Sequence, residues 1–332
     1  MNPYVHYRET NMRISSLYLL FLLIIPYTSN AVSCNISNVS PVNFGTVNPL
    51  SQTDTRTSMT FRYTCSKALT DVLAGVTLCF NLGPSAVSGN INYRQLALTT
   101  QPASNIMYQL YQDPAYANVW GSQFQSGTTY PMVKIPLPDL LPVSGSLTVY
   151  GLLSGSLTAA LPGNYQDNYT PSTANVTLNI GLLSPPSACG TTSGPSFPFN
   201  VTAFITKQCN INFVNDVNLG SVNAGQQNIV SSSTLSVSCS ANTSYTIGLT
   251  PSNGNAFGRG TMKTSNTNTD LVMYQLQSTS GTNGTPWGNS PQTTVAGTGS
   301  GQPTIFNVYA IVPQTAVSPD NYSDTVTITI IY

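Results

Sequence analysis

Two halves of this chain carry the same landmarks in the same order, and this internal repeat limits the folds that the chain can adopt. Each half opens with Cys-Asn-Ile and a following Asn-x-Gly-x-Val segment, at residues 34–47 and again at 209–222. A second cysteine, a Met-Tyr-Gln-Leu segment, a Trp-Gly pair and a Tyr-x-Asp segment follow in both halves. The repeats run from about 32 to 183 and from about 207 to 332, which predicts two domains of one fold.

Short alternating segments dominate each repeat. Residues 325–330 and 176–180 alternate between polar and apolar side chains, as a strand with one buried face does. We find no segment with a convincing helical period, and each repeat holds six or seven such strands separated by turn residues. The sequence therefore predicts an all-β protein with two immunoglobulin-like β-sandwich domains in tandem, the second lacking its last strand for the reason given below.

The first 31 residues have the features of an export signal. Basic Arg8 and Arg13 precede an apolar run over residues 17–25, and small residues lead to a cleavage site after Ala31. The apolar run is too short to cross a membrane as a helix. Translation from Met12 would give a shorter signal, and a lipoprotein cleavage site before the first cysteine is the rival interpretation. We expect residues 1–31 to be removed as a signal peptide.

The six cysteines fit an oxidising compartment and the repeat. One pair is separated by 31 positions and another by 30, at equivalent places in the two repeats. The two remaining cysteines have no counterpart in the second repeat, so we expect them to pair with each other. The predicted disulfide bonds are Cys34–Cys65, Cys209–Cys239 and Cys79–Cys189.

The composition leaves little material for catalysis. The only histidine, His6, and the only glutamate, Glu9, both lie in the export signal. Charged residues make up 6% of the chain and the formal net charge is zero, so no basic surface for nucleic acid is expected. The remaining aspartates are scattered beside turn residues. We predict a protein that is not an enzyme, with no catalytic residues, no metal site, no cofactor and no nucleic-acid partner.

The segment between the repeats has one strongly apolar face. Its odd positions are apolar, whereas its even positions are polar apart from Phe204: the apolar residues are Phe197, Phe199, Val201, Ala203 and Ile205. Burial of five such side chains contributes on the order of 10 kcal/mol before costs. We therefore predict a strand at about 197–206 that completes the first domain, residues 32–206.

A matching segment is expected neither before the first repeat nor after the second. The second repeat ends on its sixth strand at Tyr332. We therefore expect the second domain, residues 207–332, to have an open acceptor groove beside its last strand. The edge of this groove is predicted to be formed by Val326, Ile328 and Ile330.

These landmarks resemble the spore coat protein U domain family, which supplies subunits of Csu-type archaic chaperone–usher pili. The Cys-Asn-Ile, Asn-x-Gly-x-Val and closing Pro-Asp-Asn-Tyr-Ser-Asp-Thr-Val segments carry the resemblance over both repeats. It implies donor-strand complementation, in which an extension of one subunit fills the groove of the next. Here the match to that extension is internal, so the chain resembles the two-domain tip adhesin with an N-terminal adhesive domain and a C-terminal pilin domain.

The resemblance also implies partners and a location. The partners are an adjacent pilin subunit, a periplasmic chaperone and an outer-membrane usher, and the role is surface attachment in biofilm formation. The chain would pass through the periplasm to the pilus tip on a Gram-negative cell surface. The alternative is a non-terminal structural pilin or coat protein without an adhesive role.

Apolar loops of the first repeat are candidates for the adhesive surface. They are the loop after Cys65 and the proline-rich stretch between Trp120 and Leu147; the candidates are Leu69, Val72, Leu73, Leu140, Leu141 and Val143. These side chains could instead cap the sandwich core. A third possibility is a sugar site. The aromatic rings that would stack on the carbohydrate are those of Tyr108, Tyr111, Tyr116 and Trp120.

Overall fold

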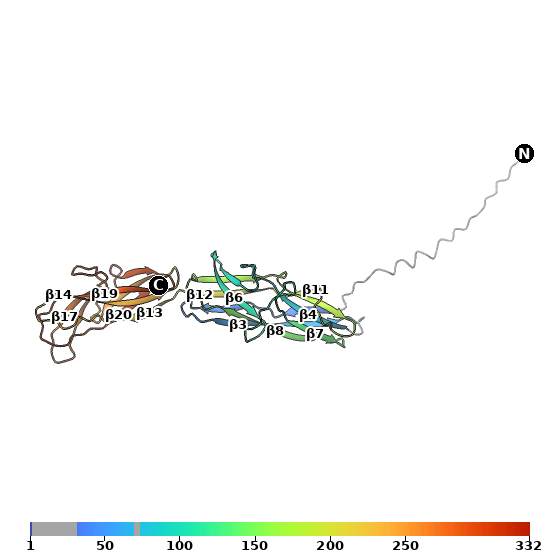
Figure 1. Ribbon diagram of the computed structural model, residues 1–332, viewed down its shortest axis with the longest axis horizontal. Coiled ribbons are helices and arrows are strands. Elements are labelled where there is room, and N and C mark those ends of the chain that lie inside the picture. Colours follow the sequence, from blue (N-terminus) through green and yellow to red (C-terminus); the bar gives the residue numbers. More distant parts are fainter. Residues whose placement is uncertain (2–31, 70–73) are drawn as a thin grey trace.

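The computed structural model describes Met1 and residues 32–69 and 74–332, so the predicted signal peptide lies outside the described residues. The described residues form twenty strands and no helix, and none of their segments is a helix that could cross a membrane. Two lobes follow each other along the long axis of the molecule (Figure 1). The all-β prediction is confirmed.

The N-terminal lobe consists of β1 to β12 in two sheets. One has eight strands in the order β1-β3-β8-β6-β5-β9-β12-β2, and the other has four in the order β11-β10-β4-β7. Residues of both sheets share one hydrophobic core. The bounds are Val32–Ser37 (β1), Val42–Val47 (β2), Thr55–Lys67 (β3), Ala74–Leu82 (β4), Arg94–Leu98 (β5), Gln101–Tyr111 (β6), Met132–Leu137 (β7), Val143–Leu153 (β8), Gly163–Tyr169 (β9), Ala174–Gly181 (β10), Thr192–Ser196 (β11) and Phe199–Ile205 (β12).

The C-terminal lobe repeats this plan with fewer strands. Its sheets have the orders β13-β14-β19-β17-β16 and β18-β15-β20, and they enclose a second core. The bounds are Cys209–Val214 (β13), Gln227–Cys239 (β14), Ser244–Pro251 (β15), Arg259–Met262 (β16), Val272–Gln277 (β17), Val295–Thr298 (β18), Pro303–Gln314 (β19) and Val326–Ile331 (β20).

The Asn-x-Gly motif of each repeat forms the same turn. The side-chain oxygen of Asn43 accepts a hydrogen bond of 2.8 Å from the backbone N–H of Gly45, and Asn218 does the same for Gly220. Both glycines have positive φ, 69° and 70°, which a residue with a Cβ adopts only with strain. In the N-terminal lobe this turn lies within β2 and gives it a bulge.

The tyrosine of the Tyr-x-Asp motif fixes the start of the segment in which it lies. Its hydroxyl donates a hydrogen bond to a backbone carbonyl four residues upstream, from Tyr165 to Leu161 at 2.9 Å and from Tyr322 to Ser318 at 2.8 Å. This is the tyrosine corner of immunoglobulin-like sandwiches. The motif is therefore explained by the fold in both lobes.

The aspartate of the same motif accepts a hydrogen bond from the tyrosine of Met-Tyr-Gln-Leu. Tyr108 donates to Asp167, and Tyr274 donates to Asp324 at 2.6 Å. Burial raises the pKa of both tyrosine hydroxyls, and the neighbouring aspartates add to the effect. Asp167 is buried whereas Asp324 is half-exposed, so the two lobes differ in how well this pair is shielded from water.

The two tryptophans occupy equivalent core positions. The indole N–H of Trp120 donates to the carbonyl of Phe80, and that of Trp287 to the carbonyl of Ile247, both at 2.9 Å. Trp120 and Tyr108 are buried, so the interpretation that they stack on a sugar is wrong for these two side chains.

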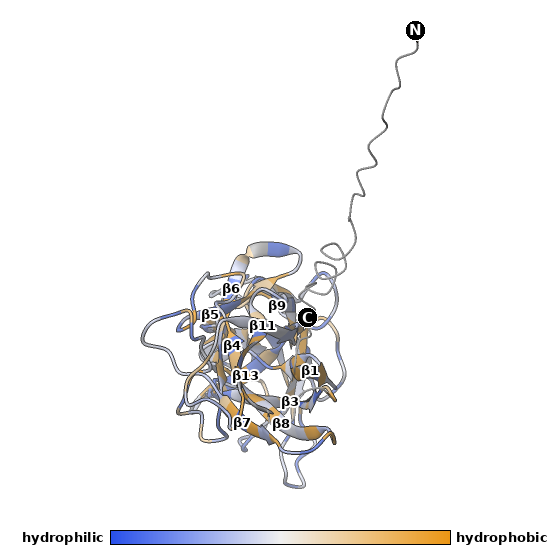
Figure 2. Ribbon diagram, turned by 90° about the vertical axis from the view of Figure 1, so that its right-hand side faces the viewer, coloured by the Kyte–Doolittle hydropathy of each residue, from blue (hydrophilic) through white to orange (hydrophobic). Residues whose placement is uncertain are grey.

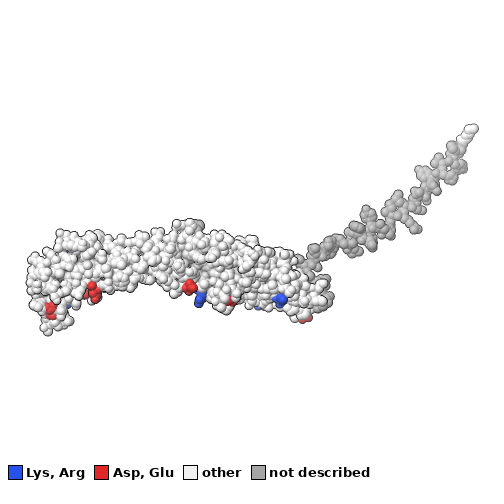
Figure 3. Space-filling model, in the orientation of Figure 1, with Lys and Arg blue, Asp and Glu red and all other residues white. Residues whose placement is uncertain are grey.

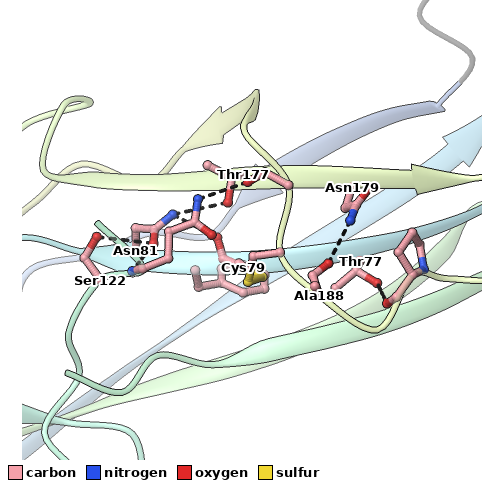
Figure 4. The surroundings of a disulfide bond; sticks show 12 residues. Thr77, Cys79, Asn81, Ser122, Thr177, Asn179 and Ala188 are labelled. Atoms are coloured by element: carbon pink, nitrogen blue, oxygen red, sulfur yellow. Dashed lines mark hydrogen bonds between the residues drawn. A yellow bond between two sulfur atoms is a disulfide. The ribbon is translucent and has the colours of Figure 1, made fainter. Parts of the chain in front are cut away.

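The structure contains the three disulfide bonds that the repeat predicts, and the described residues include no free cysteine. Cys34–Cys65 and Cys209–Cys239 join opposite residues of paired strands. Cys79–Cys189 ties the segment before β11 to β4 beside Asn81, whose buried side-chain amide interacts with Thr177 of β10 and with Ser122 in the loop between β6 and β7 (Figure 4).

Replacement of Cys79 and Cys189 together by serine should destabilise the N-terminal lobe alone. The bond closes a loop of 110 residues, and the chain-entropy account assigns such a loop about 4–5 kcal/mol. Calorimetry of the full chain should show a lower melting temperature for one transition and an unchanged second transition. A shift of both transitions, or of neither, would contradict this assignment.

Replacement of Tyr108 by phenylalanine should cost more stability than the same change at Tyr274. The first change leaves Oδ2 of the buried Asp167 carboxyl group without its donor, although Oδ1 keeps the backbone N–H donors of Ala86 and Asn168, and should cost about 2–3 kcal/mol. Water can replace the donor at the half-exposed Asp324. Denaturant unfolding of the two variants measures the difference. Equal losses would show that the shielding of the two pairs is the same.

Candidate functional site

Strand β12 lies between β9 and β2 in the eight-stranded sheet of the N-terminal lobe. It runs antiparallel to β9 and parallel to β2, and Val201 lies opposite both Asp167 and Val42. All five apolar side chains predicted to form its inner face are buried: Phe197, Phe199, Val201, Ala203 and Ile205. The strand proper begins at Phe199, two residues later than predicted, because Pro198 has no N–H to donate to a neighbouring strand.

The C-terminal lobe has a groove at the equivalent place. Residues 217–222 match β2 and residues 320–325 match β9, but neither segment forms a strand. Among the described residues, their only β-ladder pairing is an isolated bridge between Ser323 and Lys263. The groove between them has a volume of about 430 Å³. Its walls include Leu219, Gly220, Val222, Ile229, Met262, Val272, Val312, Val317, Pro319 and Tyr322.

Side chains with equivalent positions differ in exposure between the lobes. Val42 and Phe44 are buried beneath β12, whereas their counterparts Val217 and Leu219 are half-exposed. The tyrosine of Tyr-x-Asp is likewise buried in the N-terminal lobe and half-exposed in the C-terminal lobe. The groove is therefore an apolar core that lacks one strand.

The residues predicted to form the groove edge lie elsewhere. Val326, Ile328 and Ile330 belong to β20, are half-buried against the core, and do not line the groove. In the N-terminal lobe, β12 pairs with β9 and not with β10. The groove therefore lies beside residues 320–325, which match β9, and not beside β20, which matches β10. The outer edge of β20 carries no strand among the described residues, and in the N-terminal lobe the equivalent edge of β10 pairs with β11.

Side-chain hydrogen bonds hold the rim of the groove. Asp320 accepts from the amide of Asn266 at 2.7 Å and from the backbone N–H of Asn321 at 2.8 Å. Asp270 accepts from the backbone N–H of Ser318 at 2.8 Å. These backbone N–H donors lower the pKa of both carboxyl groups, so both are charged at neutral pH. The rim is acidic and ordered without β-pairing.

Three loops meet at the end of the N-terminal lobe farthest from the C-terminal lobe, which we call the apex. They follow β3, β7 and β10, whose ends are adjacent in the strand registers. Figure 1 shows this end on the right, and Figure 2 looks onto it. Five leucines of these loops are exposed: Leu69 (84%), Leu140 (49%), Leu141 (75%), Leu182 (86%) and Leu183 (78%).

The sequence interpretation of these loops needs three changes. Leu69, Leu140 and Leu141 are exposed, but Val143 begins β8 and packs against the core. Val72 and Leu73 lie outside the described residues. Leu182 and Leu183 were not predicted, although two adjacent leucines between a strand and a Ser-Pro-Pro-Ser segment are a visible signal.

Polar contacts attach two of the apical loops to the sandwich. The ammonium group of Lys67 donates to the carbonyl of Pro138 at 2.8 Å, beneath Leu140 and Leu141. The hydroxyl of Thr77 donates to the carbonyl of Pro186 at 2.6 Å. Leu140, Leu141, Leu182 and Leu183 thus stand on loops that are hydrogen-bonded to the sandwich.

The described residues include no group of three or more His, Cys, Asp or Glu that could hold a metal ion. Charged side chains are sparse over the face seen in Figure 3. The groove offers apolar pockets and unpaired backbone groups, and the apex offers apolar side chains.

Two solved structures illustrate what this chain is similar to, and the first of them shares its fold. A chain of the CsuC–CsuE chaperone–tip adhesion subunit pre-assembly complex from Acinetobacter baumannii is 14% identical, with a TM-score of 0.50 over 90% of this chain and 100% of that chain. The CupB6 tip adhesin from Pseudomonas aeruginosa is 13% identical, with a TM-score of 0.34 over 90% of this chain and 94% of its own. Comparison with curated protein sequences gives no match.

The sequence profile of the spore coat protein U domain matches residues 26–171 and again residues 196–329. The two matches cover most of the chain and coincide with the two repeats. The second match begins just before β12 and includes the groove-lining segments. The chain belongs to the spore coat protein U domain family.

Proposed function

We propose that this chain is the tip adhesin of a chaperone–usher pilus, which attaches the pilus to surfaces in biofilm formation. One observation carries the proposal: the N-terminal lobe contains its own strand β12, and the C-terminal lobe has an open groove at the equivalent place. A subunit that accepts a strand and keeps its own donor strand inside can occupy only one end of a polymer.

The groove accepts a strand from the adjacent pilin subunit. The pairing of β12 supplies the register: the incoming strand runs antiparallel to residues 320–325 and parallel to residues 217–222. A small residue is required opposite Tyr322, because Ala203 is the residue opposite Tyr165. Before assembly, a periplasmic chaperone fills the same groove, and an outer-membrane usher exports the subunit.

The apex is the adhesive surface. Its five exposed leucines stand on three loops at the end of the molecule opposite the groove-bearing lobe. A cluster of exposed apolar side chains on a monomer marks an interaction site. Domain boundaries at residues 32–206 and 207–332 follow from this division of roles between the lobes.

A peptide with the sequence of residues 192–206 should stabilise the full mature chain. The peptide has the sequence of the strand that fills the equivalent place in the N-terminal lobe. A ligand at a hundred times its Kd adds about 2.7 kcal/mol to the free energy of unfolding. Refolding with the peptide should give a monomer with a higher melting temperature for one transition. The matched control is the same peptide with Val201→Asp and Ile205→Asp, which should have no effect. A full chain that is equally stable and monomeric without any peptide would rule out an open groove.

Replacement of Leu141 and Leu183 by aspartate should abolish attachment to apolar surfaces without reducing the number of pili. A charge in a desolvated contact costs several kcal/mol, whereas on a solvated loop it costs almost nothing. Cell attachment to polystyrene and pilus counts by electron microscopy measure the two effects. Leu271→Asp is the matched control, because that leucine in the C-terminal lobe is 50% exposed. Unchanged attachment with an unchanged melting temperature would move the contact away from the apex.

A further inference from the structure

A cluster of half-exposed tyrosines lies on the N-terminal lobe, near the ends of β3 and β8 that are distant from the apical leucines. Tyr111 of β6 lies directly opposite Tyr150 of β8, and Tyr116 in the loop after β6 contacts both. The ring centroids of Tyr116 are 5.5 Å from Tyr111 and 6.2 Å from Tyr150. The guanidinium of Arg56 lies 5.0 Å from the ring centroid of Tyr116. We call these four residues the tyrosine cluster.

The loop that carries Tyr116 is held in one conformation. The carboxylate of Asp113 accepts hydrogen bonds from the backbone N–H groups of Ala115, Ala117 and Asn118, at 3.0, 3.2 and 2.8 Å. Tyr116 itself has a φ of 57°, which a non-glycine residue adopts only when its surroundings impose it. Its ring is half-exposed, so the loop presents an aromatic side chain to solvent in a fixed position.

The fold does not require this cluster. The β6–β8 pairing corresponds to the β17–β19 pairing of the C-terminal lobe, where the residues opposite each other are Gln277 and Tyr309. The position of Arg56, nine residues before the second cysteine of the repeat, holds Val230 in the other lobe. Only one of the four members therefore has an aromatic or charged counterpart. A feature confined to one of two homologous lobes points to a role of that lobe.

The chemistry around the rings indicates a neutral ligand with many hydroxyl groups. Arg56 donates hydrogen bonds, whereas Asp54, which lies close enough to Tyr111 to raise the pKa of its hydroxyl, accepts them. Asp54 and Asp113 together would repel an anionic sugar, and the guanidinium would repel a cationic one. The tyrosine rings provide apolar faces with polar tips, which suit a ring that is apolar on its face and polar at its edge.

We propose that the tyrosine cluster binds a pyranose ring of a neutral polysaccharide, as a second contact site of the N-terminal lobe. The sugar stacks its C–H face on the aromatic surface formed by Tyr116 and its neighbours. Its hydroxyl groups bond to Arg56, Asp54 and the tyrosine hydroxyls. This site goes beyond the proposed function and does not depend on the pilus-tip position or on the apical leucines.

Binding of neutral hexasaccharides to the immobilised full mature chain tests the proposal. The probes are cellohexaose, maltohexaose and laminarihexaose, measured one at a time on a biosensor. At least one should bind saturably, and Tyr116→Ala should weaken that binding by at least about tenfold. Tyr116→Phe, which keeps the ring, should retain binding within about threefold. Tyr309→Ala, at the position in the other lobe that matches Tyr150, should leave binding unchanged.

Three outcomes would overturn the proposal. They are the absence of binding by all three hexasaccharides, equal binding by the wild type and Tyr116→Ala, and equal loss in Tyr116→Ala and Tyr309→Ala. Attachment to polystyrene by the Tyr116→Ala variant separates this proposal from the adhesin proposal. That attachment should be unchanged, because the apical leucines are distant from the cluster.

Discussion

The insertion of one strand between two others determines the rest of this structure. In the N-terminal lobe, β12 pairs with β9 on one side and with β2 on the other, so it satisfies the backbone groups of both and covers the core between the sheets. Without such a strand, the same two segments in the C-terminal lobe have almost no ladder pairing and the core is open as a groove. The N-terminal lobe thus shows which strand the C-terminal lobe lacks. Because the two lobes are repeats, equivalent residues can be compared one by one.

Much of this arrangement follows from local patterns in the sequence. The alternation at residues 197–206 predicts a buried strand, and the spacing of cysteines in two copies predicts the three disulfide bonds that the structure contains. The position of the groove does not follow from local patterns. The chain crosses from one sheet to the other between β9 and β10, and only the three-dimensional pairing shows that β12 lies beside the first of these two strands.

Two further features depend on strand pairing that sequence patterns do not fix, although the sequence alone makes Tyr111 and Tyr116 candidates for a sugar site. Strand β11 has the sequence Thr-Ser-Gly-Pro-Ser, which has no strand propensity, and it forms because β10 offers it an edge and Cys189 anchors the segment before it. The cluster of Tyr111, Tyr116 and Tyr150 joins residues from two strands and a loop. Contacts between residues so distant in sequence depend on strand register, which alternation does not fix.

The open groove keeps its shape because its walls do not depend on the missing strand. Tyr322 donates to Ser318 and accepts from Asn268 at 2.8 Å, and Tyr274 of β17 donates to Asp324. These bonds fix the segment that would pair with an incoming strand, although that segment has almost no ladder pairing of its own. A strand that enters therefore meets a preformed wall, and less conformational entropy is lost on binding than if the wall had to order at the same time. The Tyr-x-Asp motif thus has two consequences in this family fold: it forms the tyrosine corner in both lobes, and in the C-terminal lobe it fixes one wall of the groove.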